Sequence, residues 1–234
     1  MTKLRPVWAV IPIKEVQDAK QRLSGRLSAA DRRRLAQAMI SDVLETVVQV
    51  EELAGVVVVT VDPEVTALAF RLGITVFCEG ARDGHTGSVM AAAQRLAAEG
   101  KAMLTMPADI PLVAADDIRA VIAARKADRS FTIVPARDLQ GSNAILISPA
   151  DAVPVRFGDN SYFPHLDAAE AAGIEPSVVR RAGIELDVDT PDDFAALKDA
   201  LLANTQATGK RTAAVVGEIV SMDRANGYLL ACCT

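Results

Sequence analysis

Aspartates that follow two apolar segments could together bind a divalent cation. Asp109 stands between the prolines of Pro107-Ala108-Asp109-Ile110-Pro111, just after the apolar run Met103–Met106, so its backbone is restricted and its carboxylate is held at one angle. Asp187 and Asp189 alternate with apolar residues in Leu186-Asp187-Val188-Asp189, which predicts a strand with both carboxylates on one side. Mg²⁺ prefers oxygen ligands and usually takes one or two carboxylates together with substrate phosphates. We therefore predict a magnesium site formed by Asp109 with Asp187 or Asp189.

Ordinary structural roles compete with this interpretation. Asp109 could cap a turn. Asp189 comes shortly before Pro191, a pattern that is also typical of the first turn of a helix. Capping accounts for at most one of Asp187 and Asp189, so it does not explain the pair.

Three basic residues, Lys14, Lys20 and Arg22, follow the first apolar run of the chain. They could neutralise a triphosphate and the charge that builds up as pyrophosphate leaves, and we assign catalysis to Lys20 and Asp109. A solvated basic loop is the alternative. The sequence has neither the Walker glycines of a P-loop nor a dinucleotide fingerprint, which argues against a P-loop ATPase or a dehydrogenase.

Apolar runs that alternate with amphipathic stretches predict an α/β fold with a mostly parallel sheet and helices on both faces. The predicted strands are 7–13, 56–60, 74–77, 103–106, 131–135, 144–147, 178–179 and 184–189. The predicted helices are 28–50, with Ser28 as N-cap, and 63–73, 84–98, 114–127, a stretch ending near 169, and 191–202.

In such a sheet, ligands bind beyond the carboxyl ends of the strands. Several polar residues follow predicted strands and should therefore converge on one edge of the sheet. The residues that we assign to nucleotide binding are Lys14, Lys20, Arg22, Thr60, Asp62, Gly84 and Pro107.

Two short polar segments could bind a small carboxylate or phosphate. Ser142 and Asn143 follow Gly141 in a predicted turn, and Gly158 with Ser161 belongs to a second loop. Hydroxyls, an amide and bare backbone N–H groups suit such an acceptor, although turn chemistry alone also explains each loop. His85 and His165 do not have the spacing of a metal pair, and we assign them no role.

Composition excludes several classes of protein. The net charge of −5 and the absence of a long Lys/Arg run argue against a nucleic-acid partner. Lys14 and Glu15 interrupt the first apolar run and no later run reaches membrane-spanning length, so neither a signal peptide nor a membrane segment is expected. Cys78, Cys232 and Cys233 form neither a disulfide framework nor a zinc motif, which favours a reducing, cytoplasmic setting. At 234 residues, we expect one domain over 1–204 and an extension over 205–234.

A set of motifs, in this order, resembles the CofC/FbiD guanylyltransferases of coenzyme F-420 biosynthesis. The motifs are Ala9-Val10-Ile11-Pro12-Ile13-Lys14 with Ala19-Lys20-Gln21-Arg22-Leu23, Pro107-Ala108-Asp109-Ile110-Pro111-Leu112, Gly141-Ser142-Asn143-Ala144, Arg156-Phe157-Gly158 with Ser161, and Leu186-Asp187-Val188-Asp189-Thr190-Pro191. The resemblance covers residues 7 to about 200. The last motif alone is shared by many nucleotidyltransferases, whereas the whole set is specific.

The resemblance implies a single-domain, Rossmann-like nucleotidyltransferase that moves GMP from GTP to a small phosphorylated acid and releases pyrophosphate. The acceptor stays open among 2-phospho-L-lactate, phosphoenolpyruvate and 3-phospho-D-glycerate. By this resemblance Asn143, Gly158 and Ser161 bind the acceptor, and the basic loop binds the triphosphate.

One departure from the family pattern concerns the base-binding edge, where Gly84-His85-Thr86-Gly87-Ser88 replaces the expected Gly-Leu-Asn. Base preference is therefore left open, and two rival functions stay under consideration. One is a cytidylyltransferase like those of the molybdenum cofactor, although their Gly-rich Leu-Ala-Gly-Gly loop is missing here. The other is a catalytically silent binding paralogue. For the extension, packing against a second subunit of a homodimer and disorder are both open.

Overall fold

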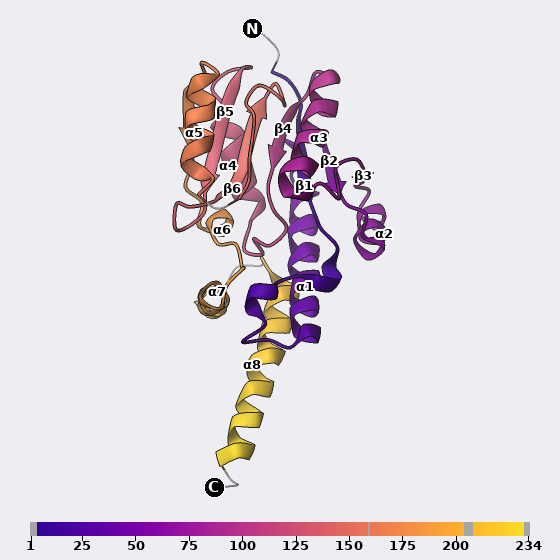
Figure 1. Ribbon diagram of the computed structural model, residues 1–234, viewed down its shortest axis with the longest axis vertical. Coiled ribbons are helices and arrows are strands. Elements are labelled where there is room, and N and C mark those ends of the chain that lie inside the picture. The colour runs from indigo at the N-terminus through magenta and orange to yellow at the C-terminus, as the bar shows by residue number, and fades with distance from the viewer. Residues whose placement is uncertain (1–3, 159, 204–207, 232–234) are drawn as a thin grey trace.

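The structure is a computed structural model that describes residues 4–158, 160–203 and 208–231. Its strands are β1 (Val7–Pro12), β2 (Gly55–Val59), β3 (Thr75–Phe77), β4 (Ala102–Thr105), β5 (Ser130–Pro135), β6 (Ser142–Ser148) and β7 (Pro176–Val178). They form one sheet in the order β3-β2-β1-β4-β6-β5-β7 (Figure 1). Only β6 runs antiparallel to its neighbours, β4 and β5, so the predicted mostly parallel sheet is confirmed.

The helices connect the strands in the alternating manner that the sequence predicts. They are α1 (Ala29–Val47), α2 (Pro63–Arg71), α3 (Gly84–Ala98), α4 (Ala115–Ala123), α5 (Tyr162–Ala171), α6 (Ala182–Glu185), α7 (Pro191–Ala203) and α8 (Lys210–Ala231). Two 3₁₀ turns, η1 (Val16–Asp18) and η2 (Gln21–Leu23), lie between β1 and α1. The predicted N-cap is confirmed, because the Ser28 side chain accepts a hydrogen bond from the Asp31 amide.

The sheet is buried on both faces, which explains why its strands are continuous apolar runs. Ala9 and Ile11 of β1 belong to one core, which includes Ile40 of α1. Val10 points to the opposite face and belongs to a second core with Val89 of α3. Helices therefore cover both faces of the sheet, as Figure 1 shows.

A third apolar cluster joins the loop after β1 to α1, α7 and α8 and to the segment before α7. Its buried members are Leu23, Leu27, Leu35, Met39, Leu186, Val188, Phe194, Leu197, Val216 and Ile219. The cluster brings together parts of the chain that are far apart in sequence, and two of its members, Leu23 and Val188, are close neighbours in sequence of predicted site residues.

The predicted strand over 184–189 is wrong. Residues up to Glu185 form the short helix α6, and the following segment has no ladder partner. The Val188 amide donates to the Asp109 carbonyl at 3.1 Å, which is a loop contact and not part of a ladder. Apolar alternation survives because Leu186 and Val188 are buried while Asp187 and Asp189 stay half-buried. An extended loop whose side chains are alternately buried and half-buried therefore has the same alternating apolar sequence pattern as a strand.

Two other predictions need smaller corrections. Ser142 and Asn143 open β6 instead of lying in the turn before it, and both are buried. Helix α4 ends at Ala123, short of the predicted 127, and Arg125 lies beyond it with its guanidinium donating to the Arg5 carbonyl and the Ser148 hydroxyl. Arg125 also donates to the carbonyls of Ala127 and Asp128, so its side chain holds the non-helical segment that follows α4.

Helix α8 occupies most of the predicted extension and packs against α1, and Figure 1 shows it continuing away from the sheet. The proposed boundary near residue 204 and the cysteines Cys232 and Cys233 lie outside the described residues. Among the residues described, no helix combines the length and apolarity needed to cross a membrane.

A single buried carboxylate fixes the start of α8. Asp42 of α1 accepts hydrogen bonds from the amides of Arg211 and Thr212 and from the Thr212 hydroxyl, at 3.1, 2.8 and 2.7 Å. The Asp42 carboxylate thus accepts from amides in the first turn of α8, which have no acceptor within the helix.

Asp42→Ala should lower the free energy of unfolding by about 2–3 kcal/mol, because three donors lose their acceptor. Urea denaturation followed by circular dichroism measures the change. Asp199→Ala is the matched control, since the Asp199 side chain is 75% exposed; it should change stability by less than about 0.5 kcal/mol. Equal effects of the two substitutions would contradict the anchoring role of Asp42.

Candidate functional site

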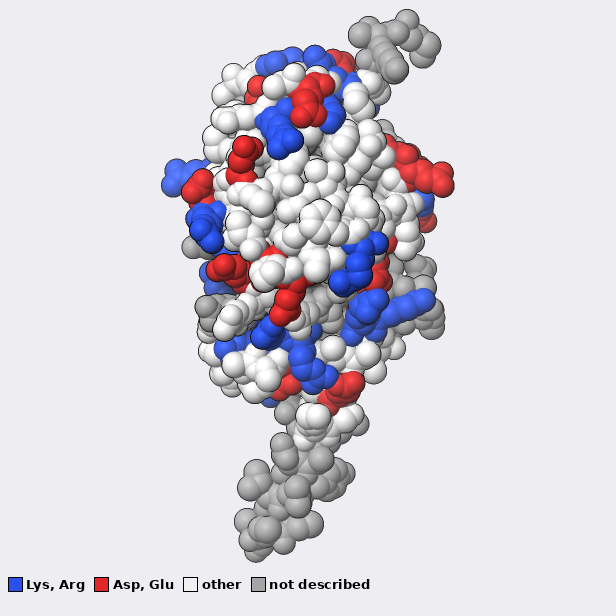
Figure 2. All heavy atoms as spheres, turned by 90° about the vertical axis from the view of Figure 1, so that its right-hand side faces the viewer, with Lys and Arg blue, Asp and Glu red and all other residues white. Residues whose placement is uncertain are grey.

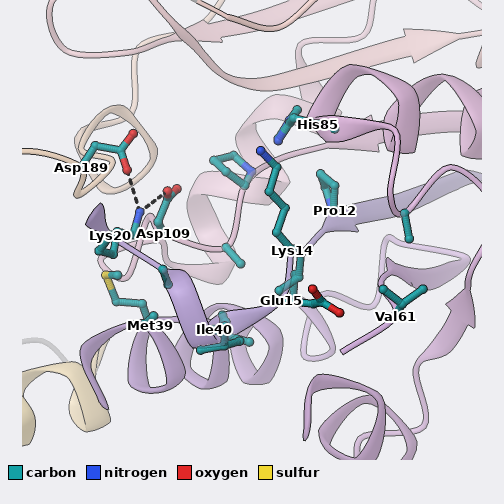
Figure 3. A pocket seen from close by; sticks show the side chains of 18 of the residues that line it. Pro12, Lys14, Glu15, Lys20, Met39, Ile40, Val61, His85, Asp109 and Asp189 are labelled. Atoms are coloured by element: carbon teal, nitrogen blue, oxygen red, sulfur yellow. Dashed lines mark hydrogen bonds and ion pairs between the residues drawn. The ribbon is translucent and has the colours of Figure 1, made fainter. Parts of the chain in front are cut away.

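A cavity of about 750 Å³ opens where β1 and β4 end. Its wall comes from the segments after these strands, from the start of α3 and from α1 (Figure 3). The lining residues are Pro12, Ile13, Lys14, Glu15, Val16, Ala19, Lys20, Ala36, Met39, Ile40, Val61, Ala81, Arg82, Gly84, His85, Pro107, Ala108, Asp109 and Asp189. The position matches the ligand crevice expected at the carboxyl ends of parallel strands.

Lys20 lies between two of the predicted site aspartates. Its Nζ donates to Asp109 Oδ2 at 2.6 Å and to Asp189 Oδ1 at 2.8 Å, as the dashed lines in Figure 3 mark. The Lys20 side chain is only 9% exposed, against 25% for Asp109 and 43% for Asp189. One buried ammonium thus joins two carboxylates from different parts of the chain.

The charges of this group stabilise one another. Burial disfavours the Lys20 ammonium, but Asp109 and then Asp189 outweigh that penalty and raise the pKa of Lys20 above its usual value. Burial also disfavours the Asp189 carboxylate, and Lys20, followed by Arg22 and Lys14, lowers the pKa of Asp189 below its usual value. Lys20 and Asp189 are therefore both charged at neutral pH.

Local backbone structure delivers Lys20 to this position. Lys20 adopts the left-handed conformation, with φ 58° and ψ 42°, between η1 and η2. On one side the Val16 amide donates to Asp62 Oδ2 at 2.9 Å. On the other side Leu23 is fully buried in the third apolar cluster. The loop is thus held at both ends, so a residue in a conformation that costs energy is kept there by its surroundings.

The two carboxylates are held together by backbone as well as by Lys20. The Val188 amide bonds to the Asp109 carbonyl, and Val188 itself is buried beside Leu23 in the third cluster. This places Asp189 next to the loop that carries Lys20. Asp109 Oδ1 is buried and has no hydrogen-bond partner among the described residues.

Asp187 lies near the pair but does not line the cavity. Asn143 Nδ2 donates to Asp187 Oδ1 at 2.9 Å and also to the Ile184 carbonyl at 3.0 Å. Burial raises the pKa of Asp187, Asn143 partly offsets this rise, and the neighbouring charges of Asp109 and Asp189 add to it. The amide of Asn143 is therefore committed to fixing the segment that carries the aspartates.

The fit of these residues to a metal ion can be judged from their chemistry. Within the described part of the chain, no group of three or more His, Cys, Asp and Glu residues is arranged to hold a metal alone. Asp109 nevertheless offers a buried carboxylate oxygen without a partner, and Asp189 shares a cation with it already. One or two carboxylates completed by substrate phosphates is the arrangement that Mg²⁺ commonly takes.

The residues assigned to nucleotide binding divide into two groups. Lys14, Lys20, Gly84 and Pro107 line the cavity. Arg22, Thr60 and Asp62 do not, although the charge of Arg22 acts on Asp189.

Thr60 and Asp62 have structural partners that account for their polarity. The Thr60 hydroxyl accepts from the Asp62 amide at 3.0 Å. Asp62 Oδ1 accepts from the amides of Glu64 and Val65 and so caps α2, while its other oxygen holds Val16. They support the wall of the cavity without lining it.

Two of the residues assigned to acceptor binding, Ser142 and Ser161, are hydrogen-bonded to a buried histidine. Ser142 Oγ lies 2.9 Å from His165 Nδ1, and His165 Nε2 accepts from the Arg156 amide at 3.0 Å. Because Nε2 is the acceptor, the proton is on Nδ1 and is donated to Ser142. Ser161 precedes α5, and its carbonyl accepts from the His165 amide. Gly158 has φ 146°, which favours glycine.

Two histidines that the sequence left without a role prove to be part of the site region. His85, in the first turn of α3, lines the cavity, and burial lowers its pKa to about 4. Burial likewise lowers the pKa of His165 to about 4. Phe157 lies between them, with ring centroids 4.4 Å from His85 and 5.2 Å from His165. The position of His85 at a helix start after a strand was the signal that could have identified it.

The described residues on the face of the molecule shown in Figure 2 form no extended cationic surface. On the face shown in Figure 2, Lys and Arg side chains are interspersed with Asp and Glu side chains, in keeping with the net charge of −5. Phosphate groups would therefore be held by local residues such as Lys14 and Lys20.

Comparison with known families gives one match over most of the chain. The family described as guanylyl transferase CofC like matches residues 7–208. The match covers the whole cavity wall and ends just before α8.

Named relatives match over similar lengths. A phosphoenolpyruvate guanylyltransferase from Conexibacter woesei is 32% identical over 223 residues, which is 94% of this chain and 99% of the relative. A 2-phospho-L-lactate guanylyltransferase from Methanobrevibacter smithii is 29% identical over 188 residues, which is 80% of this chain and 82% of the relative.

A solved structure supports the fold. The crystal structure of a candidate nucleotide-diphospho-sugar transferase from Desulfovibrio desulfuricans G20 has a TM-score of 0.75 and 18% identity, and covers 94% of this chain and 97% of that one. At this identity the likeness establishes the shared fold.

The buried state of His165 gives a pH prediction. Its pKa is about 4 in the folded chain against 6.5 when unperturbed, so the unfolded chain binds more protons and stability falls as the pH drops from 6.5 to 4. His165→Phe lacks this dependence. The difference in unfolding free energy between wild type and variant should shrink by about 3 kcal/mol between pH 7 and pH 4. Urea denaturation across this range measures it, and a constant difference would mean that His165 titrates normally.

Proposed function

Because the chain belongs to the guanylyl transferase CofC-like family, we propose that its cavity binds GTP and that GMP passes from there to a small phosphorylated acid. The chain is a nucleotidyltransferase of the guanylyltransferase kind, in coenzyme F-420 biosynthesis. The products are a diphosphate-linked guanosine derivative and pyrophosphate.

The observation that carries the proposal is the ammonium of Lys20 held between Asp109 and Asp189 in the wall of the cavity. A structural ion pair alone does not require a cavity of about 750 Å³ around it. Lys14 and Lys20 place positive charge where the triphosphate would lie, and Arg22 adds charge near Asp189. These cations would stabilise the charge that develops on the departing pyrophosphate.

The reaction needs no covalent protein intermediate. The phosphate of the acceptor is already an anionic nucleophile, and its oxygen attacks the α-phosphorus while the bond to the pyrophosphate oxygen breaks. The protein then has to align the two substrates and neutralise charge. The ion pairs of Lys20 with Asp109 and Asp189 would hold these charged groups in position before the substrates bind, which serves alignment as well as charge neutralisation.

Magnesium is part of this proposal. Asp109, with Asp187 or Asp189, would hold it, supported by the unpartnered buried oxygen of Asp109. Bound Mg²⁺ would neutralise phosphate charge and polarise the α-phosphoryl group. If the metal took Asp109 and Asp189, the two carboxylates that Lys20 bonds, the Lys20 ammonium would become available to the phosphates.

For the acceptor we propose Ser142, Asn143, Gly158 and Ser161. Ser142 and Asn143 already have partners within the protein, in His165 and Asp187, so their contribution includes fixing the site. Phosphoenolpyruvate is the first acceptor to test, because the relative named for it matches nearly its full length. 2-Phospho-L-lactate and 3-phospho-D-glycerate are the other candidates.

The two rival functions are less well supported. The family match favours guanylyl over cytidylyl transfer. A silent binding paralogue has no need of a buried lysine shared by two cavity aspartates, and this chain has one.

The decisive experiment is a pyrophosphate-release assay of four nucleoside triphosphates against the three acids, with and without Mg²⁺. We expect release with GTP, with one acid preferred and with strict dependence on the metal. Release with CTP in place of GTP would support the cytidylyl alternative. The absence of release across the whole set would overturn the proposal.

Asp109→Asn should reduce turnover about a hundred-fold or more, because a charged oxygen ligand and half of the Lys20 ion-pair network are lost. Its circular dichroism spectrum should match wild type. Asp116→Asn is the control, since the Asp116 side chain is 88% exposed on α4. Normal turnover of Asp109→Asn would refute its role.

A further inference from the structure

Thr86, in the first turn of α3, is bonded to both backbone polar groups of Phe157. The Phe157 amide donates to Thr86 Oγ1 at 3.0 Å, and Thr86 Oγ1 donates to the Phe157 carbonyl at 3.3 Å. The two residues are 71 positions apart in sequence. The Thr86 hydroxyl thus pairs both the amide and the carbonyl of Phe157, as a neighbouring strand would. These two bonds fix the orientation of the Phe157 backbone.

The neighbouring amide is held by a residue of another helix. The Arg156 amide donates to His165 Nε2 of α5. Consecutive amides of the loop are therefore bound to side chains of two different helices, one from α3 and one from α5. The Phe157 ring adds to this, because it packs edge-on against both His85 and His165.

The next residue, Gly158, begins the part of the loop that the proposed function assigns to the acceptor. Its φ of 146° lies in the region that favours glycine. Among the described residues, its chain neighbours apart, no atom lies within 4 Å of where a Cβ would be. Open space beside a fixed, side-chain-free backbone suits the close approach of a small anion.

The start of α3 thus serves two parts of the site. Gly84 and His85 line the nucleotide cavity, whereas Thr86 is absent from its lining and turns to the Phe157 loop. A residue used by the nucleotide should line the cavity.

We propose that Thr86 is a positioning residue for the phosphorylated acid, which it serves by holding the Phe157–Gly158 backbone in the conformation that receives this substrate. The inference rests on the proposed function and deepens it, since it assigns acceptor binding to a helix whose preceding residues serve the nucleotide. His85 supports the same loop through its ring contact with Phe157.

The hydroxyl is the part of Thr86 that matters. It both accepts and donates, which serine can reproduce and valine cannot. Valine keeps the shape and the β-branched character of threonine, so Thr86→Val removes the two hydrogen bonds with little change in bulk. Thr86→Ser restores them.

The test measures steady-state kinetics with GTP, Mg²⁺ and phosphoenolpyruvate, or whichever acid the wild-type enzyme prefers. Thr86→Val should raise the KM for the acid about ten-fold, as expected for loss of two hydrogen bonds, and leave the KM for GTP within about two-fold. Thr86→Ser should restore the KM for the acid. Thr46→Val is the matched control, because the Thr46 hydroxyl donates to the Asp42 carbonyl within α1, away from the cavity.

Three results would overturn the inference: an unchanged KM for the acid in Thr86→Val, a rise confined to the KM for GTP, or failure of Thr86→Ser to restore the acid KM. Each of these leaves the proposed function intact, because wild-type turnover is measured alongside. Lack of wild-type turnover with every acid would instead defeat the proposed function and the role of Thr86 with it.

Discussion

The site depends on one ammonium group shared by two carboxylates. Lys20 is nearly buried, and an unpaired lysine there would lose its proton or unfold its loop. Asp109 and Asp189 prevent this, although they lie 89 and 169 residues away in sequence. The loop after β1, the end of β4 and the segment before α7 must therefore all be in place before the Lys20 ammonium has both of its partners. The folding step that brings these segments together therefore also forms the ion pairs of the site.

Apolar packing sets the positions of the charged residues more closely than the charges alone would. Leu23 and Val188 belong to the same cluster, so burial of their side chains brings the Lys20 loop against the Asp187–Asp189 segment. The Val188 amide then fixes that segment to the Asp109 carbonyl. Ion pairs are strong only at short range and in fixed geometry, and here the geometry is set by residues that carry no charge. Helix α8 contributes to the same cluster through Val216 and Ile219.

The cavity and the loop that we propose for the acceptor meet at the start of α3. His85 and His165 are both neutral because they are buried, and the ring of Phe157 joins them. The contacts of Phe157 make the loop before α5 part of a continuous packed structure with the cavity wall. A shift of α3 would therefore also move the Phe157–Gly158 loop.

The sequence by itself determined the elements and much of the chemistry. Continuous apolar runs identified the buried strands, Ser28 and Pro63 marked helix starts, and a carboxylate after a strand end pointed to Asp109, because these signals depend on neighbours in the chain. Tertiary structure alone decided which polar residues face the cavity. Asp62 was assigned to nucleotide binding but holds Val16 and caps α2. His85 was assigned no role but lines the cavity. The alternation around Asp187 and Asp189 came from burial of a loop and not from a strand. Such outcomes depend on contacts between residues far apart in sequence, which local patterns do not encode.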